Sequence, residues 1–151
     1  MIVKEMSQAD CEAMVSETRL ARLACSMDGQ TYVVPINFAF ARPYFYGFSM
    51  PGQKIEWMRA NPKVCLLFEK FTGGREWLSV VCYGTYEELP DRIGWKHERE
   101  QAWSLLGKHA NWWEPGGLKP IPGPVASSST HLFYRIKAEQ MTGRQSVDDA
   151  G

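Results

Sequence analysis

A short segment in the first half of the chain combines the residue types that hold a phosphate group. Ser49 ends a predicted strand, and Gly52, Gln53 and Lys54 follow it at the start of a helix predicted over 53–60. Unpaired N–H groups and the helix dipole favour an anion there, glycine lets the backbone approach closely, and lysine adds a positive charge. The segment predicts a phosphate site, and a solvated lysine at a helix start is the alternative.

A second group of candidates lies on the strand predicted over 31–40. Its apolar side chains alternate, so one face should be buried. Pro35 cannot donate a ladder hydrogen bond, which favours an edge strand or a bulge there. Asn37 interrupts the apolar pattern and needs a hydrogen-bond partner, unless it faces water at the sheet edge.

Elements along the whole chain must position these residues. A helix is expected over 8–17, a hairpin turn at Asp28-Gly29, and a strand over 76–88 with a bulge or bend at Gly84. The strands follow one another as hairpins without regular βαβ units, which predicts a mainly antiparallel sheet closed into a barrel. The remaining expectations are strands over 19–25, 44–49, 64–68 and 131–141, a helix from 90 to about 109, and an irregular loop over 110–129.

Bulk composition restricts the class of protein. The 151 residues suit one domain, expected over 1–144, with a mobile tail over 145–151. Lys+Arg and Asp+Glu are both 17, so no basic face for nucleic acid is expected and self-association is unhindered. The N-terminus does not resemble a signal peptide, and no apolar run is long enough to cross a membrane, so we expect a cytoplasmic protein.

Metal binding is not expected from the cysteines and histidines. The four cysteines form no CxxC motif, and buried free thiols in a reducing compartment are the simpler interpretation. The three histidines have no ligand spacing, and no Ser/His/Asp or Cys/His arrangement can be argued. The residues concerned are Cys11, Cys25, Cys65, Cys82, His97, His109 and His131.

Taken in order, several short motifs resemble the pyridoxamine 5′-phosphate oxidase-related flavin-binding proteins, in the branch that includes the nitroimidazole-resistance proteins. The resemblance implies a six-stranded antiparallel split β-barrel of Greek-key type with a few peripheral helices. It also implies a homodimer with FMN at the subunit interface. The motifs are Arg22-Leu-Ala24, Val34-Pro-Ile-Asn37, Gly52-Gln-Lys54, Asn61-Pro-Lys-Val64, Trp77-Leu-Ser-Val80, Gly84 and Thr142-Gly-Arg144.

The resemblance also implies roles for individual residues. Lys54 matches the basic residue that binds the phosphate, and Ser49 and Gln53 are its neighbours in that motif. The backbone of the strand that carries Pro35, Ile36 and Asn37 should lie along the flavin ring. Trp77 and Ser79, two residues apart on one side of a strand, should approach the same ring, although Trp77 could equally be a core or interface residue.

The predicted loop over 110–129 carries the adjacent Trp112 and Trp113. Two neighbouring tryptophans in an extended segment cannot both face one core, so one of them could cover the flavin or a substrate, or close the dimer. A long loop of this kind in a small domain is often functional.

The motifs depart from those of the oxidases proper. The oxidases carry Ser-Arg-Lys where this chain has Gly52-Gln53-Lys54, and Arg-Gln-x-Arg where it has Leu78-Ser79-Val80-Val81. Oxidation of pyridoxamine phosphate is therefore not expected. The resemblance favours an FMN-dependent oxidoreductase that passes electrons from a reduced nicotinamide to a nitro compound or quinone. A flavin carrier or sensor without turnover, and a haem- or F420-binding relative, are the alternatives.

Overall fold

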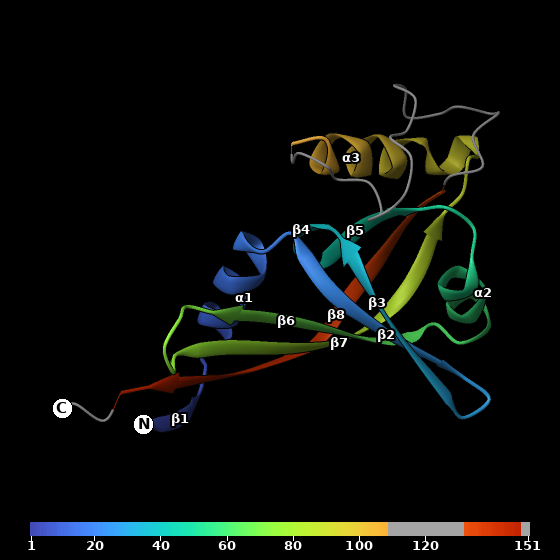
Figure 1. The fold of residues 1–151 in the computed structure, drawn as a ribbon. Coiled ribbons are helices and arrows are strands. Elements are labelled where there is room, and N and C mark those ends of the chain that lie inside the picture. Colours follow the sequence, from blue (N-terminus) through green and yellow to red (C-terminus); the bar gives the residue numbers. More distant parts are fainter. Residues whose placement is uncertain (109–131, 149–151) are drawn as a thin grey trace.

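The computed structural model describes residues 1–108 and 132–148, and the loop with Trp112 and Trp113 lies outside this part of the chain. Strands predominate, with three α-helices and one 3-10 helix in the described part (Figure 1). In chain order the elements are β1 (Ile2–Glu5), α1 (Gln8–Glu17), β2 (Leu20–Met27), β3 (Gln30–Asn37), β4 (Ala39–Ala41), β5 (Tyr44–Ser49), α2 (Gln53–Ala60), β6 (Lys63–Phe71), β7 (Trp77–Leu89), η1 (Ile93–Trp95), α3 (Lys96–Leu106) and β8 (Leu132–Val147).

One antiparallel sheet curls into an open barrel. Its strand order is β3-β2-β6-β7-β8-β5-β4, and β1 pairs with the far part of β8. The two outermost strands, β3 and β4, follow one another directly in the chain. The barrel is therefore joined at its split by the chain itself, which passes from the β2 side to the β5 side through Phe38.

The strand expected over 31–40 is thus divided in two. Phe38 donates its backbone N–H to the carbonyl of Arg19 at 3.1 Å, and its ring packs edge-on against Phe45 and Phe68. The predicted alternation is confirmed, because Ile36 and Phe38 are each 2% exposed and face the core. Pro35 lies on β3 at the end of the sheet order, as its missing N–H predicts.

Several predicted elements are confirmed to the residue, among them α1, β5 and α2. Asp28 and Gly29 both have positive φ, the geometry of the expected hairpin turn, and the ladder register shifts at Gly84. The helix expected from residue 90 begins only after the 3-10 turn at Ile93.

The strand count and the C-terminal boundary were predicted incorrectly. The sheet has eight strands among the described residues, because β1 was missed and the strand over 31–40 is divided. The mobile tail expected from residue 145 does not begin there: β8 continues to Val147, where it pairs with Ile2 of β1. An N-terminal partner 145 residues away in sequence could not be recognised from local pattern.

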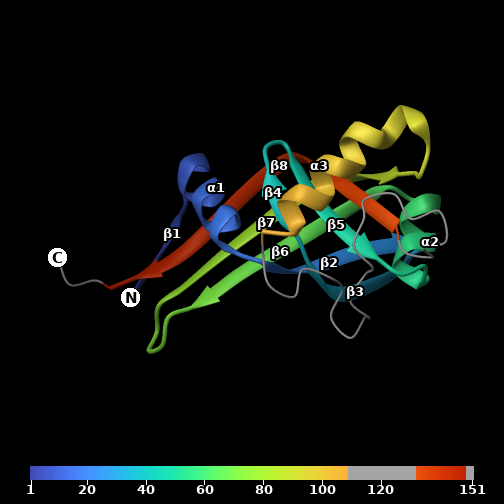
Figure 2. The same ribbon diagram turned by 90° about the horizontal axis from the view of Figure 1, so that it is seen from above.

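The interior contains two apolar clusters. The larger fills the barrel, and α1 and α2 contribute buried side chains to it. The smaller lies where α3 packs over β4 and β5, with Leu89, Leu106 and Phe133 buried (Figure 2). None of the described helices is long and apolar enough to span a membrane.

Candidate functional site

The helix start that the sequence singles out is present at one end of the barrel. Gly52 precedes α2 and has no side chain that could accept a hydrogen bond from the first N–H groups of the helix. Gln53 is exposed there, whereas Lys54 is only 7% exposed. Burial raises the pKa of the Cys25 thiol, and the nearby positive charge of Lys54 partly opposes that rise. A buried cation beside an uncapped helix start is suited to an anion.

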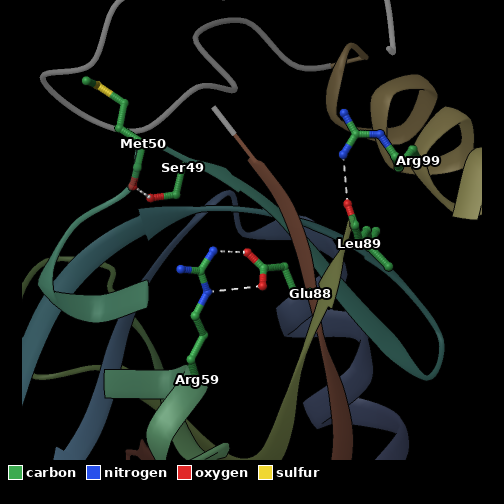
Figure 3. A network of polar contacts seen from close by, with 6 residues as sticks. All are labelled: Ser49, Met50, Arg59, Glu88, Leu89 and Arg99. Carbon is green, nitrogen blue, oxygen red and sulfur yellow. Dashed lines mark hydrogen bonds and ion pairs between the residues drawn. The ribbon is translucent and has the colours of Figure 1, made fainter. Parts of the chain in front are cut away.

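Ser49 lies at the end of β5, just before the turn to α2. It is completely buried, and its hydroxyl donates to the carbonyl of Met50 at 2.8 Å (Figure 3). The hydroxyl proton is therefore used within the chain, at the turn that leads from β5 toward α2. Direct contact of Ser49 with a phosphate stays a prediction.

Two contacts anchor the far end of α2. The Arg59 guanidinium donates to both carboxylate oxygens of Glu88, with Nε at 3.1 Å, and so ties the last helical turn to the end of β7 (Figure 3). Asn61 Nδ2 donates to the carbonyl of Ser26 at 3.1 Å. These contacts fix the C-terminal end of α2 against β7 and β2.

Trp77 and Ser79 line a separate hollow of about 390 Å³. Trp77 is held at the start of β7, where its backbone N–H donates to Ser146 Oγ at 3.0 Å. Ser79 pairs with Arg144 on β8, which brings an indole, a hydroxyl and a guanidinium together. The volume lies in the range of small-molecule sites. The full lining is Glu5, Met6, Gln8, Trp77, Ser79, Val81, Thr142, Gly143 and Arg144.

The N-terminal wall of this hollow was not predicted. Met6 donates its backbone N–H to the carbonyl of Gly143 at 2.8 Å, and Gln8 Nε2 donates to the carbonyl of Met141 at 2.7 Å. A Cβ on Gly143 would lie 2.7 Å from Cys11 Sγ and 2.8 Å from Met6 Sδ, so any other residue there would require these side chains to shift. The sequence indicated only one side of this contact. Thr142-Gly143-Arg144 is among the motifs of the resemblance, but the N-terminal segment that packs against it is not.

The hollow opens on the side of the sheet that faces away from the core, which we call the outer face. Two rows of directly paired residues cross five strands of this face. The first row is Pro35, Arg22, Leu67, Val81 and Thr142, and the second is Val33, Ala24, Cys65, Tyr83 and Gln140. Their chain neighbours, such as Leu23, Leu66 and Cys82, are fully buried on the core side.

The predicted site residues therefore form two groups. Pro35, Asn37, Trp77 and Ser79 share the outer face, because alternate residues of each strand point to the same side. Ile36 points into the core and is 2% exposed, so only its backbone could lie along a ring, as the resemblance implies.

The residues that were predicted to bind the phosphate, Ser49, Gln53 and Lys54, lie at the other end of the barrel. The C-cap of α2 contacts Ser26, four residues along β2 from Arg22. Arg22 and Val81 belong to one row across the sheet. Trp77 lies four residues along β7 from Val81, on the side of that row opposite to Ser26. Lys54 itself lies near Cys25, which is three residues from Arg22 in the same direction as Ser26. Lys54 and Trp77 are therefore roughly 20 Å apart along the sheet. One protomer does not bring the two groups together.

The described cysteines and acidic residues form no metal site. No group of three or more potential ligands occurs within residues 1–108 and 132–148. Cys11, Cys25 and Cys82 are buried free thiols, and burial raises the pKa of Cys82 to about 12. A thiol with so high a pKa is a core group rather than a nucleophile at neutral pH.

Comparison with known proteins gives the family. Residues 7–145 match the family described as pyridoxamine 5′-phosphate oxidase, and the chain therefore belongs to that family. A Rhizobium meliloti (strain 1021) protein, described only as uncharacterised, is 52% identical over 144 residues, which are 95% of each chain.

Solved structures support the fold. A Mesorhizobium loti protein described as FAD-binding is 48% identical, with a TM-score of 0.80 over 97% of this chain and 100% of that chain. A Bacteroides thetaiotaomicron structure, described provisionally as a 5-nitroimidazole antibiotic resistance protein, is 22% identical, with a TM-score of 0.71 over 96% of this chain and 89% of that chain. The second likeness concerns the fold alone.

Proposed function

We propose that the protein is a flavin-dependent oxidoreductase that passes electrons from a reduced nicotinamide to a small acceptor such as a nitro compound or a quinone. The observation that carries the proposal is the hollow of about 390 Å³ with Trp77, Ser79 and Arg144 on its wall. An indole beside hydroxyl and guanidinium donors suits a flat ring with a polar edge. Family membership makes a flavin the first candidate for that ring.

Each part of a flavin has a suitable group in this chain. Lys54 and the uncapped start of α2 would hold the phosphate, and Trp77, Ser79 and the β3 backbone at Pro35 would flank the ring. The bound flavin would supply the two-electron chemistry, while these residues bind and orient it. Because the two groups lie at opposite ends of one barrel, we propose that a homodimer assembles each site from two copies.

FMN is the cofactor that the resemblance favours, and FAD is the second candidate. The observation in favour of FAD is the 48%-identical Mesorhizobium loti structure, which is described as an FAD-binding protein. Heat or acid should release the cofactor from purified protein, and chromatography against both standards then separates the two. The cytoplasm is the proposed location.

Reduction by nicotinamide tests whether the protein is an oxidoreductase. Under anaerobic conditions, NADH or NADPH should bleach the absorbance of the oxidised flavin, and adding a nitroaromatic compound or a quinone should restore it. Bound flavin that neither nucleotide bleaches would contradict the enzyme proposal and favour a carrier or sensor.

A further inference from the structure

A second hollow, of about 400 Å³, lies on the outer face and is not among the sites predicted from the sequence. It is formed at the start of β2 and on the neighbouring strand β6. We call it the arginine hollow, and we call the hollow with Trp77 on its wall the tryptophan hollow. The lining of the arginine hollow is Thr18, Arg19, Leu20, Arg22, Leu67 and Glu69.

The two hollows are neighbours on the sheet. Leu67 of the arginine hollow pairs directly with Val81 of the tryptophan hollow, and Glu69 pairs in the same way with Ser79. Since β2 lies on the other side of β6, Arg22 is two strand spacings, or about 10 Å, from Val81. One extended ligand can therefore occupy both hollows.

The arginine hollow carries two cations that the protein itself uses little. The Arg19 guanidinium forms no hydrogen bond or ion pair within residues 1–108 and 132–148, although the Arg19 carbonyl is fixed by the backbone N–H of Phe38 at 3.1 Å. Arg22 Nε lies 3.5 Å from Glu69 Oε1, which is long for a charge-assisted hydrogen bond, and the side chains are 46% and 35% exposed. An exposed pair of this length contributes little, so an anion can replace the carboxylate as the partner of Arg22.

Charge decides in which direction an anionic ligand can leave the tryptophan hollow. On the β1 side, Glu5 lines the wall, and its carboxylate repels a phosphate. On the β2 side, Arg19 and Arg22 attract one. Leu20, which is 43% exposed, adds an apolar surface there that suits a ribose or an adenine.

We propose that the arginine hollow binds the pyrophosphate of the reduced nicotinamide dinucleotide, while the nicotinamide ring lies against the flavin ring in the tryptophan hollow. Guanidinium groups match phosphate oxygens in a bidentate geometry, and Arg19 and Arg22 donate to them. The two rings must be in contact for electrons to pass, so the rest of the dinucleotide extends across the outer face toward the cations. This inference rests on the proposed oxidoreductase function and specifies how the electron donor is held.

Two electron donors that differ in the pyrophosphate test the proposal on flavin-loaded protein. NADH carries this group, whereas 1-benzyl-1,4-dihydronicotinamide has the same reducing ring without it. Arg19→Ala and Arg22→Ala should each raise the KM for NADH roughly tenfold and leave the KM for the benzyl compound unchanged. An unchanged KM for NADH, or an equal increase for both donors, would overturn the proposal.

Matched variants show whether the position of the charge matters. Arg19→Lys keeps a positive charge and should recover part of the affinity for NADH that Arg19→Ala loses. Arg92→Ala removes an exposed arginine next to η1, outside the lining of both hollows, and should leave both KM values unchanged. A tenfold increase in the KM for NADH in Arg92→Ala as well would contradict a local site.

Calorimetry with ADP-ribose separates this inference from the proposed function, because ADP-ribose carries the pyrophosphate without the nicotinamide ring and needs no turnover. The wild type should bind ADP-ribose, and Arg19→Ala should bind it roughly tenfold more weakly. This result, together with a bound flavin that neither donor bleaches, would retain the arginine hollow as a pyrophosphate site and reject the oxidoreductase. Bleaching by NADH together with ADP-ribose binding that is absent, or is unchanged in Arg19→Ala, would retain the oxidoreductase and reject the arginine hollow.

Discussion

Lys54, at the start of α2, lies near Cys25 on β2, and Trp77 lies at the start of β7, roughly 20 Å away along the strands. Both residues were predicted to serve one cofactor, Lys54 at its phosphate and Trp77 at its ring, and their side chains do not contact one another within this barrel. The separation makes assembly of the site from two copies the simplest account of both groups.

Replacing Lys54 should weaken flavin binding. Lys54→Ala removes a buried cation at the start of α2, and a charge-assisted contact of this kind is worth roughly 1.5–3 kcal/mol. Titration of apoprotein with FMN, followed by fluorescence quenching, measures the loss. Lys54→Met keeps most of the apolar volume and should lose a similar amount, whereas Lys63→Ala removes an exposed cation and should not. Unchanged affinity in Lys54→Ala would exclude Lys54 from the site.

The pair of Arg59 and Glu88 should stabilise the protein modestly. Glu88→Ala removes both contacts to the last turn of α2, and a partly exposed bidentate pair is worth roughly 0.5–1 kcal/mol. Urea unfolding measures the change. Glu100→Ala, which breaks a single-contact pair on α3, is the control and should cost less. Equal losses in the two variants would show that the pair does not anchor α2.

Gly143→Ala should disturb the N-terminal wall of the hollow. The new Cβ would meet Cys11 Sγ at 2.7 Å and Met6 Sδ at 2.8 Å, so the N-terminal segment must shift, at a cost of about 1–3 kcal/mol. Thermal unfolding and flavin affinity report the two consequences. Gly94→Ala has no neighbour within 4 Å of its new Cβ and should change neither. A Gly143→Ala protein as stable as the wild type would contradict the close packing.

The buried thiol of Cys82 predicts a loss of stability in alkali. Burial raises its pKa from 9.0 to about 12, so the folded state favours the protonated thiol. The stabilisation is complete below pH 9 and is lost as the pH rises through about 12. Urea unfolding at several pH values should give a smaller alkaline decrease for Cys82→Ala than for the wild type. An identical decrease in both proteins would contradict the assignment.

Local pattern was sufficient for the elements that carry the candidate residues. The bounds of β5 and α2 followed from a turn before Tyr44, a helix start at Gly52 and the stop at Asn61-Pro62. The core face of β3 followed from alternation alone. The edge position of Pro35 followed from its missing donor.

The pairing of strands that are distant in the chain could not be predicted from the local sequence pattern. The pairing of β1 with β8, and hence the wall formed by Glu5 and Met6, joins the two ends of the chain. The distance between Lys54 and Trp77 depends on the register of β2, β6 and β7, which no single strand encodes. The resemblance supplied the identity of these residues but not their separation within one protomer.

Flavin binding is the central claim, and the absorbance spectrum of the purified protein tests it most directly. We expect the two visible bands of an oxidised flavin, either as isolated or after incubation with FMN or FAD followed by gel filtration. Failure of the folded protein to retain either flavin would contradict the account, and a Soret band in place of the flavin bands would favour a haem-binding relative.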